Sequence, residues 1–157
     1  MKNRINWYVP YGCTLHRSFP LFSERPGRLT VLETLPKELG LTIPFAKIAT
    51  EEMILRAHSR EYVTHVHEVG EMSLLKATLT NMRSPYLQAY TRVGAHTYFA
   101  ALCAVGAVCD AVEVALQNPS VRSFCAVRPP GHHAGRARGE GFCIFNNVAI
   151  GGLHAHA

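Results

Sequence analysis

The sequence has few of the patterns that mark several common classes of protein. Its five cysteines are an odd number without a Cys-x-x-Cys pair, and they fall at Cys13, Cys103, Cys109, Cys125 and Cys143. A disulfide framework or a zinc finger is not indicated, because both depend on paired or closely spaced residues. We interpret these cysteines as reduced thiols, most of them buried, in a cytoplasmic protein.

Membrane and secretion signals are also scarce. The residues from Met1 to Trp7 contain no apolar segment of the kind found in signal peptides. The uncharged run 98–109 is interrupted by Asp110 and Glu113 before it reaches the roughly 20 residues that a membrane span needs. We therefore expect a cytoplasmic protein without membrane association.

Positive charge is in excess but is not clustered. The chain has 16 Lys and Arg residues against 11 Asp and Glu residues, a net charge of +5. It has no Lys/Arg run and no basic stripe interleaved with aromatic residues, which nucleic-acid-binding surfaces usually carry. A nucleic-acid-binding domain is therefore the weakest of the functional hypotheses.

Strand and helix patterns alternate along the chain. They predict, in order, a strand at Ile5–Val9, a helix from Pro26 to about Leu35, a strand at Phe45–Ala49, helices after Thr50 and Ser59, a helix over 91–118, a strand at Val121–Val127 and a helix from Asn146 or Asn147. Pro36 is expected to kink or restart the first helix. This alternation predicts an α/β fold with a mainly parallel sheet and helices on both of its faces.

Two adjacent histidines are the most informative feature. His132 and His133 follow Pro129-Pro130-Gly131, which should end the preceding strand and place both rings at its carboxyl end. In open α/β sheets, ligands bind at that end of the strands. Two imidazoles in one pocket can differ in protonation, so that one exchanges a proton while the other stays charged. The alternative is a pair of surface histidines in a loop.

The stretch Arg128 to Ala134, with Gly141-Phe142-Cys143-Ile144-Phe145-Asn146-Asn147 after it, resembles the histone deacetylase-like zinc amidohydrolases. The resemblance extends to Ser23–Leu29, to 49–63 and to 91–106, and it is strongest to bacterial members related to acetylpolyamine and class II deacetylases. It implies the arginase/deacetylase fold, a three-layer α/β/α arrangement, here incomplete. Residues 1–157 would form the amino-terminal part of a single catalytic domain.

The resemblance also implies roles for individual residues. His133 corresponds to the family's general acid/base and His132 to its charge-supporting partner. Gly141 and Phe142 correspond to one wall of the substrate channel, although a buried Phe beside a strand is more often a core residue. Arg28 corresponds to an arginine near an internal channel, with a surface ion pair as its alternative. Tyr90 stands where many members carry an aspartate, which favours small acylated amines over peptides as substrates.

Zinc is expected for the complete family domain. Its ligands, an Asp-x-His pair and a further Asp, and the transition-state tyrosine follow the Phe-Asn-Asn helix in the family, and this chain does not encode them. We therefore expect no metal ligands and no tightly bound zinc here. His154 and His156, two apart on a helix, point too far apart to hold one ion.

Three functional hypotheses follow. The first is the amino-terminal portion of a zinc-dependent deacylase acting on acetyl-lysine or acetylpolyamine amides, inactive as this chain alone. The second is a non-catalytic deacetylase-like protein that binds an acylated ligand or forms homo-oligomers through an exposed sheet edge. The third is the nucleic-acid-binding domain.

Overall fold

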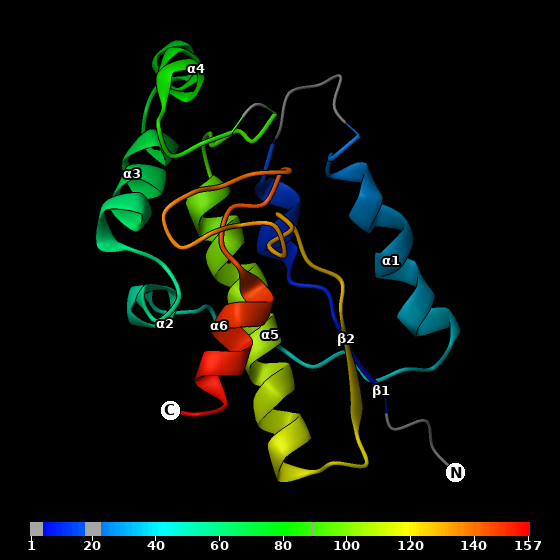
Figure 1. The fold of residues 1–157 in the computed structure, drawn as a ribbon. Helices are drawn as coiled ribbons and strands as arrows, with labels where there is room; N and C mark the ends of the chain where they lie inside the picture. The colour runs from blue at the N-terminus through cyan, green and yellow to red at the C-terminus, as the bar shows by residue number, and fades with distance from the viewer. Residues whose placement is uncertain (1–4, 18–22, 89) are drawn as a thin grey trace.

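The computed structural model describes residues 5–17, 23–88 and 90–157. It is an α/β structure with a small parallel sheet (Figure 1). Its elements are β1 (Ile5–Tyr8), the 3-10 helix η1 (Tyr11–Leu15), α1 (Gly27–Glu38), α2 (Glu51–Leu55), α3 (Arg60–Gly70), α4 (Leu74–Arg83), α5 (Thr97–Gln117), β2 (Arg122–Cys125) and α6 (Asn147–His154).

The sheet consists of β1 and β2, paired in parallel with Ile5 opposite Arg122 and Tyr8 opposite Cys125. On the other edge of β1, Asn6 forms a single parallel bridge with Thr42. The predicted strand at Phe45–Ala49 was wrong. Pro44 carries no amide hydrogen for a ladder, and the backbone beyond it is bound elsewhere, since the Lys47 amide donates to Asp110 at 2.7 Å.

Helices lie on both sides of this sheet, α1 on one and α5 on the other (Figure 1). Trp7 of β1 faces α1, and Phe124 of β2 stacks on its ring with centroids 4.3 Å apart. Cys125 faces α5, where its thiol lies 3.6 Å from the Ala107 carbonyl oxygen. A larger apolar cluster joins α3, α5 and α6 around Val66, Val105 and Ile150.

The central helix, α5, begins at Thr97 rather than at Thr91 as predicted. His96 adopts a left-handed conformation with φ of 65°, which separates 91–95 from the helix. By length and composition α5 could cross a membrane, but half of its most apolar stretch is buried within the described part of the chain. Small residues such as Ala100, Ala104 and Ala107 let neighbouring segments approach it closely.

The starts of three other helices, α2, α3 and α6, were predicted correctly. The side chains of Thr50, Ser59 and Asn146 accept hydrogen bonds from the amides of Met53, Tyr62 and Ala149 respectively. Each bond satisfies one of the free amides in the first turn of its helix. The cap at Asn146 fixes where the chain leaves the histidine loop and enters α6.

Pro36 does not break the first helix, because Trp7 compensates for it. In an α-helix the amide of residue 36 would donate to the Leu32 carbonyl, and proline has no such hydrogen. That carbonyl instead accepts the Trp7 indole Nε1–H at 3.1 Å. Helix α1 therefore continues to Glu38 and is fastened to β1 at the proline.

This substitution of donors predicts an energetic coupling between Trp7 and Pro36. Trp7→Phe leaves the Leu32 carbonyl without its donor, whereas Pro36→Ala supplies a backbone amide in its place. We expect Pro36→Ala to stabilise the Trp7→Phe protein by about 1 kcal/mol more than it stabilises the wild type. Urea unfolding of the four proteins measures this, and equal effects in both backgrounds would disprove the compensation.

Candidate functional site

The two predicted catalytic histidines lie together beyond the carboxyl end of β2. The centroids of the His132 and His133 rings are 4.2 Å apart and their planes are inclined by 49°. Both residues are exposed. Among the residues that the structure describes, no side chain is hydrogen-bonded to their ring nitrogens. The prediction that the two rings share one place in space is met, while their catalytic roles remain predictions.

The loop that carries them closes on itself. The Ile144 amide donates to the Pro130 carbonyl at 3.2 Å, and the Ala134 amide to the Gly131 carbonyl at 3.0 Å. Gly131 packs directly on the backbone that enters α6, where a Cβ would collide with the Phe145 carbonyl oxygen and lie 2.6 Å from the Asn147 amide. Only glycine allows this approach, so Gly131 fixes the distance between the histidines and α6.

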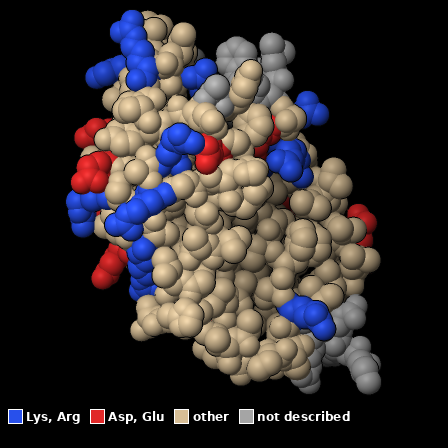
Figure 2. All heavy atoms as spheres, in the orientation of Figure 1, with Lys and Arg blue, Asp and Glu red and all other residues tan. Residues whose placement is uncertain are grey.

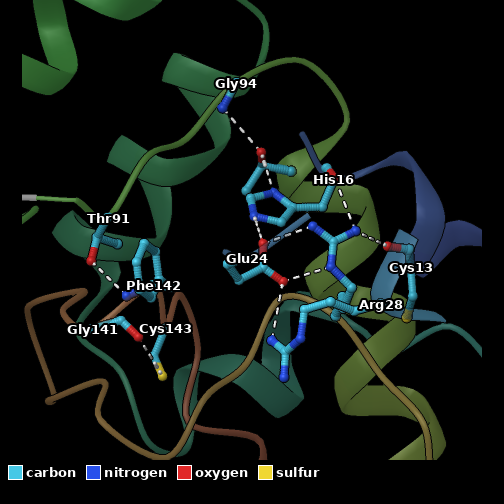
Figure 3. A network of polar contacts seen from close by, with 11 residues as sticks. Cys13, His16, Glu24, Arg28, Thr91, Gly94, Gly141, Phe142 and Cys143 are labelled. Carbon is cyan, nitrogen blue, oxygen red and sulfur yellow. Dashed lines mark hydrogen bonds and ion pairs between the residues drawn. The ribbon is translucent and has the colours of Figure 1, made fainter. Parts of the chain in front are cut away.

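Gly141 lies against the His133 ring, and Phe142 follows it in the turn that faces Thr91 (Figure 3). Gly141 has a φ of +56°, and a Cβ there would lie 2.8 Å from the His133 ring. Phe142 also has a positive φ, 67°, which is uncommon for a residue with a Cβ. Its amide donates to the hydroxyl of buried Thr91 at 3.1 Å. The backbone turn that presents Phe142 is thus held from a segment 51 residues earlier in the chain.

Beneath the loop, a buried ion pair anchors its first residue, Arg128. The Arg128 guanidinium meets the Glu24 carboxylate in a two-pronged contact, with Nε 2.5 Å from Oε1 and Nη2 2.7 Å from Oε2. Its Nη1 also donates to the carbonyls of Cys13 and His16, at 3.3 and 3.1 Å. Both charged side chains are only 2% exposed, and Figure 3 shows Glu24 at the centre of the network with His16 and Arg28 beside it. The charge is therefore buried fully paired, as its desolvation requires.

His16 extends this network toward the loop before α5. Its Nε2 lies 3.5 Å from Glu24 Oε2, and its Nδ1 is 3.0 Å from the Thr97 hydroxyl. That hydroxyl accepts the Gly94 amide, so its own hydrogen is available to His16 Nδ1. Burial, reinforced by the positive charge of Arg128 and opposed by Glu24, lowers the pKa of His16 to about 4. His16 is therefore neutral at pH 7.

Arg28 lies at the outer edge of the same network. Its side chain is 60% exposed, and its Nη1 is 4.0 Å from Glu24 Oε1, one turn earlier. It also lines a cleft of about 180 Å³ together with Arg128 and Pro130. The ion-pair interpretation of Arg28 thus corresponds to a contact in the structure, while its place near an internal channel stays a prediction.

Sequence reasoning did not find the Arg128–Glu24 pair. Glu24 and Arg128 are 104 residues apart, and the nearest opposite charge on the helical spacing of Glu24 is Arg28, not Arg128. One signal was available, since Arg128 directly follows an apolar strand and should be buried there, and a buried arginine needs a carboxylate.

Possible metal ligands are scattered over the part of the chain that the structure describes. In the described ranges 5–17, 23–88 and 90–157 there is no group of three His, Cys, Asp or Glu side chains placed to hold a metal. His154, one of the tail histidines, instead contacts Arg56 at 2.9 Å and Glu113 at 2.9 Å. The donors in these ranges therefore do not form a tetrahedral zinc site by themselves.

Surface charge is dispersed. Figure 2 shows Lys and Arg side chains over the upper and left parts of one face without a continuous band, and a broad uncharged area elsewhere. The elements at the front of this face, β2 and α6, carry the exposed apolar residues Phe124, Val148 and Leu153. This distribution does not resemble a nucleic-acid-binding surface.

The buried pair predicts a large effect of Glu24→Gln. Removing the carboxylate leaves the Arg128 charge buried and unpaired, which costs about 3–5 kcal/mol. Glu140→Gln is the matched control, because Glu140 also accepts an arginine donor at 2.7 Å but on the surface, where about 0–1 kcal/mol is expected. Urea unfolding compares them, and equal losses would contradict the assignment of Glu24 as the essential counter-charge.

His16 predicts a pH dependence of stability. Because its pKa is lower in the folded protein, the unfolded chain takes up the proton first as the pH falls below about 6.5. Its contribution is complete above that pH and is lost progressively down to about 4. We expect His16→Gln to flatten the rise of unfolding free energy between pH 4.5 and 6 by up to about 1.4 kcal/mol per pH unit. Identical slopes for variant and wild type would refute this.

Comparison with known proteins identifies the family. The family model of the histone deacetylase domain matches residues 22–157. Polyamine deacetylase HDAC10 of Danio rerio is 36% identical over 137 residues, covering 84% of this chain and 20% of HDAC10. Protein slr0245 of Synechocystis sp. is 35% identical over 147 residues, covering 89% of this chain and 45% of slr0245.

A solved structure agrees. The crystal structure of the HDA15 HD domain matches with a TM-score of 0.81 at 25% identity, covering 98% of this chain and 44% of that one. The chain thus spans less than half the length of each of these three proteins. The resemblance stated from the motifs is confirmed, and this chain belongs to the histone deacetylase domain family, homologous to class II deacetylases over part of their length.

Proposed function

We propose that residues 1–157 form the amino-terminal part of the catalytic domain of a zinc-dependent deacylase and do not hydrolyse amides alone. The observation that carries the proposal is the pair of imidazole rings 4.2 Å apart beyond the carboxyl end of β2. Family membership supports the reaction class, because relatives over this region bear the names polyamine deacetylase and histone deacetylase. The complete domain would have the three-layer α/β/α arrangement.

In this proposal the histidines handle protons. His133 takes a proton from the attacking water and later donates one to the leaving amine, since imidazole is the side chain that does both near neutral pH. His132 supports the charge that develops beside it. A catalytic imidazole is oriented by a partner on its second nitrogen, and the described residues supply none to either ring. The described part of the chain therefore supplies the proton-transfer groups without a hydrogen-bond partner that would fix their tautomers.

Acetyl-lysine and acetylpolyamine amides are the proposed substrates. Gly141 and Phe142 would form one wall of the channel that takes the aliphatic arm, with Arg28 near the internal channel below. Tyr90 is 62% exposed and directly precedes Thr91, whose hydroxyl accepts the Phe142 amide. Its presence where many family members carry an aspartate supports small acylated amines over peptides. We also propose that the protein is cytoplasmic. The described donors do not form a zinc site, so zinc would be held only in the complete domain.

A second candidate is a non-catalytic protein that forms homo-oligomers. Within the described residues, β2 is paired only through β1, and Phe124 on it is 46% exposed. An open strand edge with an apolar side chain favours pairing with a second chain. Light scattering of the purified chain decides this candidate, with a concentration-independent monomer as the result that removes it. Binding to nucleic acid is the least supported alternative.

The catalytic proposal is tested with two preparations. Purified residues 1–157 should not hydrolyse acetylpolyamines or acetyl-lysine peptides, with or without added zinc. A chimera in which this chain replaces the matching 137 residues of zebrafish HDAC10 should deacetylate polyamines, and His133→Ala should lower its rate by at least about a hundredfold.

The matched control is His156→Ala, an exposed histidine outside the loop, which should leave the rate of the chimera unchanged. Activity of the isolated chain that His133→Ala abolishes would contradict the proposed inactivity. A cooperatively folded chimera without activity, or one indifferent to His133→Ala, would contradict the proposed role of the histidines.

A further inference from the structure

His58 lies outside the predicted site, in the turn between α2 and α3. It nevertheless contacts two separate segments of the loop that carries His132 and His133. The ring is 2% exposed. Its Nε2 accepts the Asn146 amide at 2.8 Å, where the loop ends. Its Nδ1 lies 3.3 Å from the Arg136 carbonyl oxygen, just past the two histidines. One buried side chain thus joins the segment just past the histidines to the end of the loop.

These two partners define the protonation state of the ring. A backbone amide only donates, so Nε2 must carry no hydrogen, and a carbonyl oxygen only accepts, so Nδ1 must carry one. A single neutral tautomer, with hydrogen on Nδ1, satisfies both bonds. The opposite tautomer or the imidazolium would turn an N–H toward the Asn146 amide.

The surroundings hold the ring in this place. It packs between Tyr62 and Phe145, with centroids 5.5 and 5.3 Å away. The next residue, Ser59, donates its amide to the same Arg136 carbonyl at 2.9 Å. The turn before α3 therefore contacts the Arg136 carbonyl twice, through the His58 ring and the Ser59 amide.

Asn146 links the His58 hydrogen bond to the residue that follows the histidine pair. Its side-chain oxygen accepts the Ala149 amide and so caps α6, while its Nδ2 donates to the Ala134 carbonyl at 3.0 Å. Ala134 directly follows His133. Any shift of the Asn146 backbone would move both the cap and the residue beside the proposed catalytic ring.

We propose that His58 is a positioning residue, which holds the His132–His133 loop closed through its neutral Nδ1–H form. The proposal rests on the proposed function only for the catalytic role of the positioned histidines, because the two hydrogen bonds of His58 can be measured without activity. Burial, with the nearby positive charge of Arg136, lowers the pKa of His58, against the opposing hydrogen bonds to the backbone of Arg136 and Gly135. The neutral form is therefore the one present at pH 7.

Three substitutions separate the two bonds. His58→Gln keeps an acceptor at the position of Nε2, His58→Asn keeps a donor at the position of Nδ1, and His58→Phe keeps the ring packing without either bond. Hydrogen exchange of the Asn146 amide should accelerate at least about fivefold in the Asn and Phe variants, the loss of one hydrogen bond. The Gln variant should restore the wild-type rate. His67→Phe, an exposed histidine on α3, is the matched control and should change nothing.

Nitrogen-15 spectra of the wild-type chain test the tautomer directly, so the inference stays open to test even if a variant fails to fold. The expected signature is a protonated Nδ1 and a bare Nε2 at pH 7. A protonated Nε2, unchanged Asn146 exchange in His58→Phe, or failure of Gln to rescue would each overturn the proposal. An inactive chimera with a normal His58 tautomer and normal exchange would instead count against the proposed function alone.

Discussion

The buried contact between Arg128 and Glu24 is the constraint on which the candidate site depends. The Arg128 guanidinium is 2% exposed and stays protonated, so each of its buried N–H groups needs a hydrogen-bond acceptor. The carboxylate of Glu24 and the carbonyls of Cys13 and His16 supply them. Because Arg128 lies directly before the Pro-Pro-Gly turn, this contact sets where the histidine loop leaves the core. The segment around Glu24 is held there by the same charge.

The loop itself is shaped by a few close approaches rather than by regular structure. Gly131 brings the chain against the start of α6, and Gly141 brings it against the His133 ring. Thr91 and His58 then fix the loop from two other parts of the chain. Among the described residues, neither imidazole of the pair takes part in these contacts through its ring nitrogens, and both residues are exposed.

Local signals in the sequence predicted a large part of this. The capping residues Thr50, Ser59 and Asn146 gave correct helix starts, because capping is decided by neighbours within one turn. The position of the histidine pair followed from the Pro-Pro-Gly turn. Errors arose where distant contacts decide the outcome. Helix α1 runs past its predicted end near Leu35 to Glu38, with Trp7 supplying a donor at Pro36. Residues 45–49 are not a strand because Asp110 binds their backbone. The Arg128–Glu24 pair spans 104 residues and has no local signature.

The thiols carry a practical consequence of their burial. All five cysteines are unpaired, and desolvation raises the pKa of Cys13 to about 12 and of Cys109 to about 11, with an upward shift for Cys143 as well. Only the thiolate reacts with alkylating reagents, so modification at neutral pH requires that the chain open locally and admit water. Cys13 lies beside the Arg128–Glu24 pair, Cys109 lies in the central helix α5, and Cys143 lies in the histidine loop. The alkylation rate of each thiol therefore measures local opening of a different region, and no label has to be introduced.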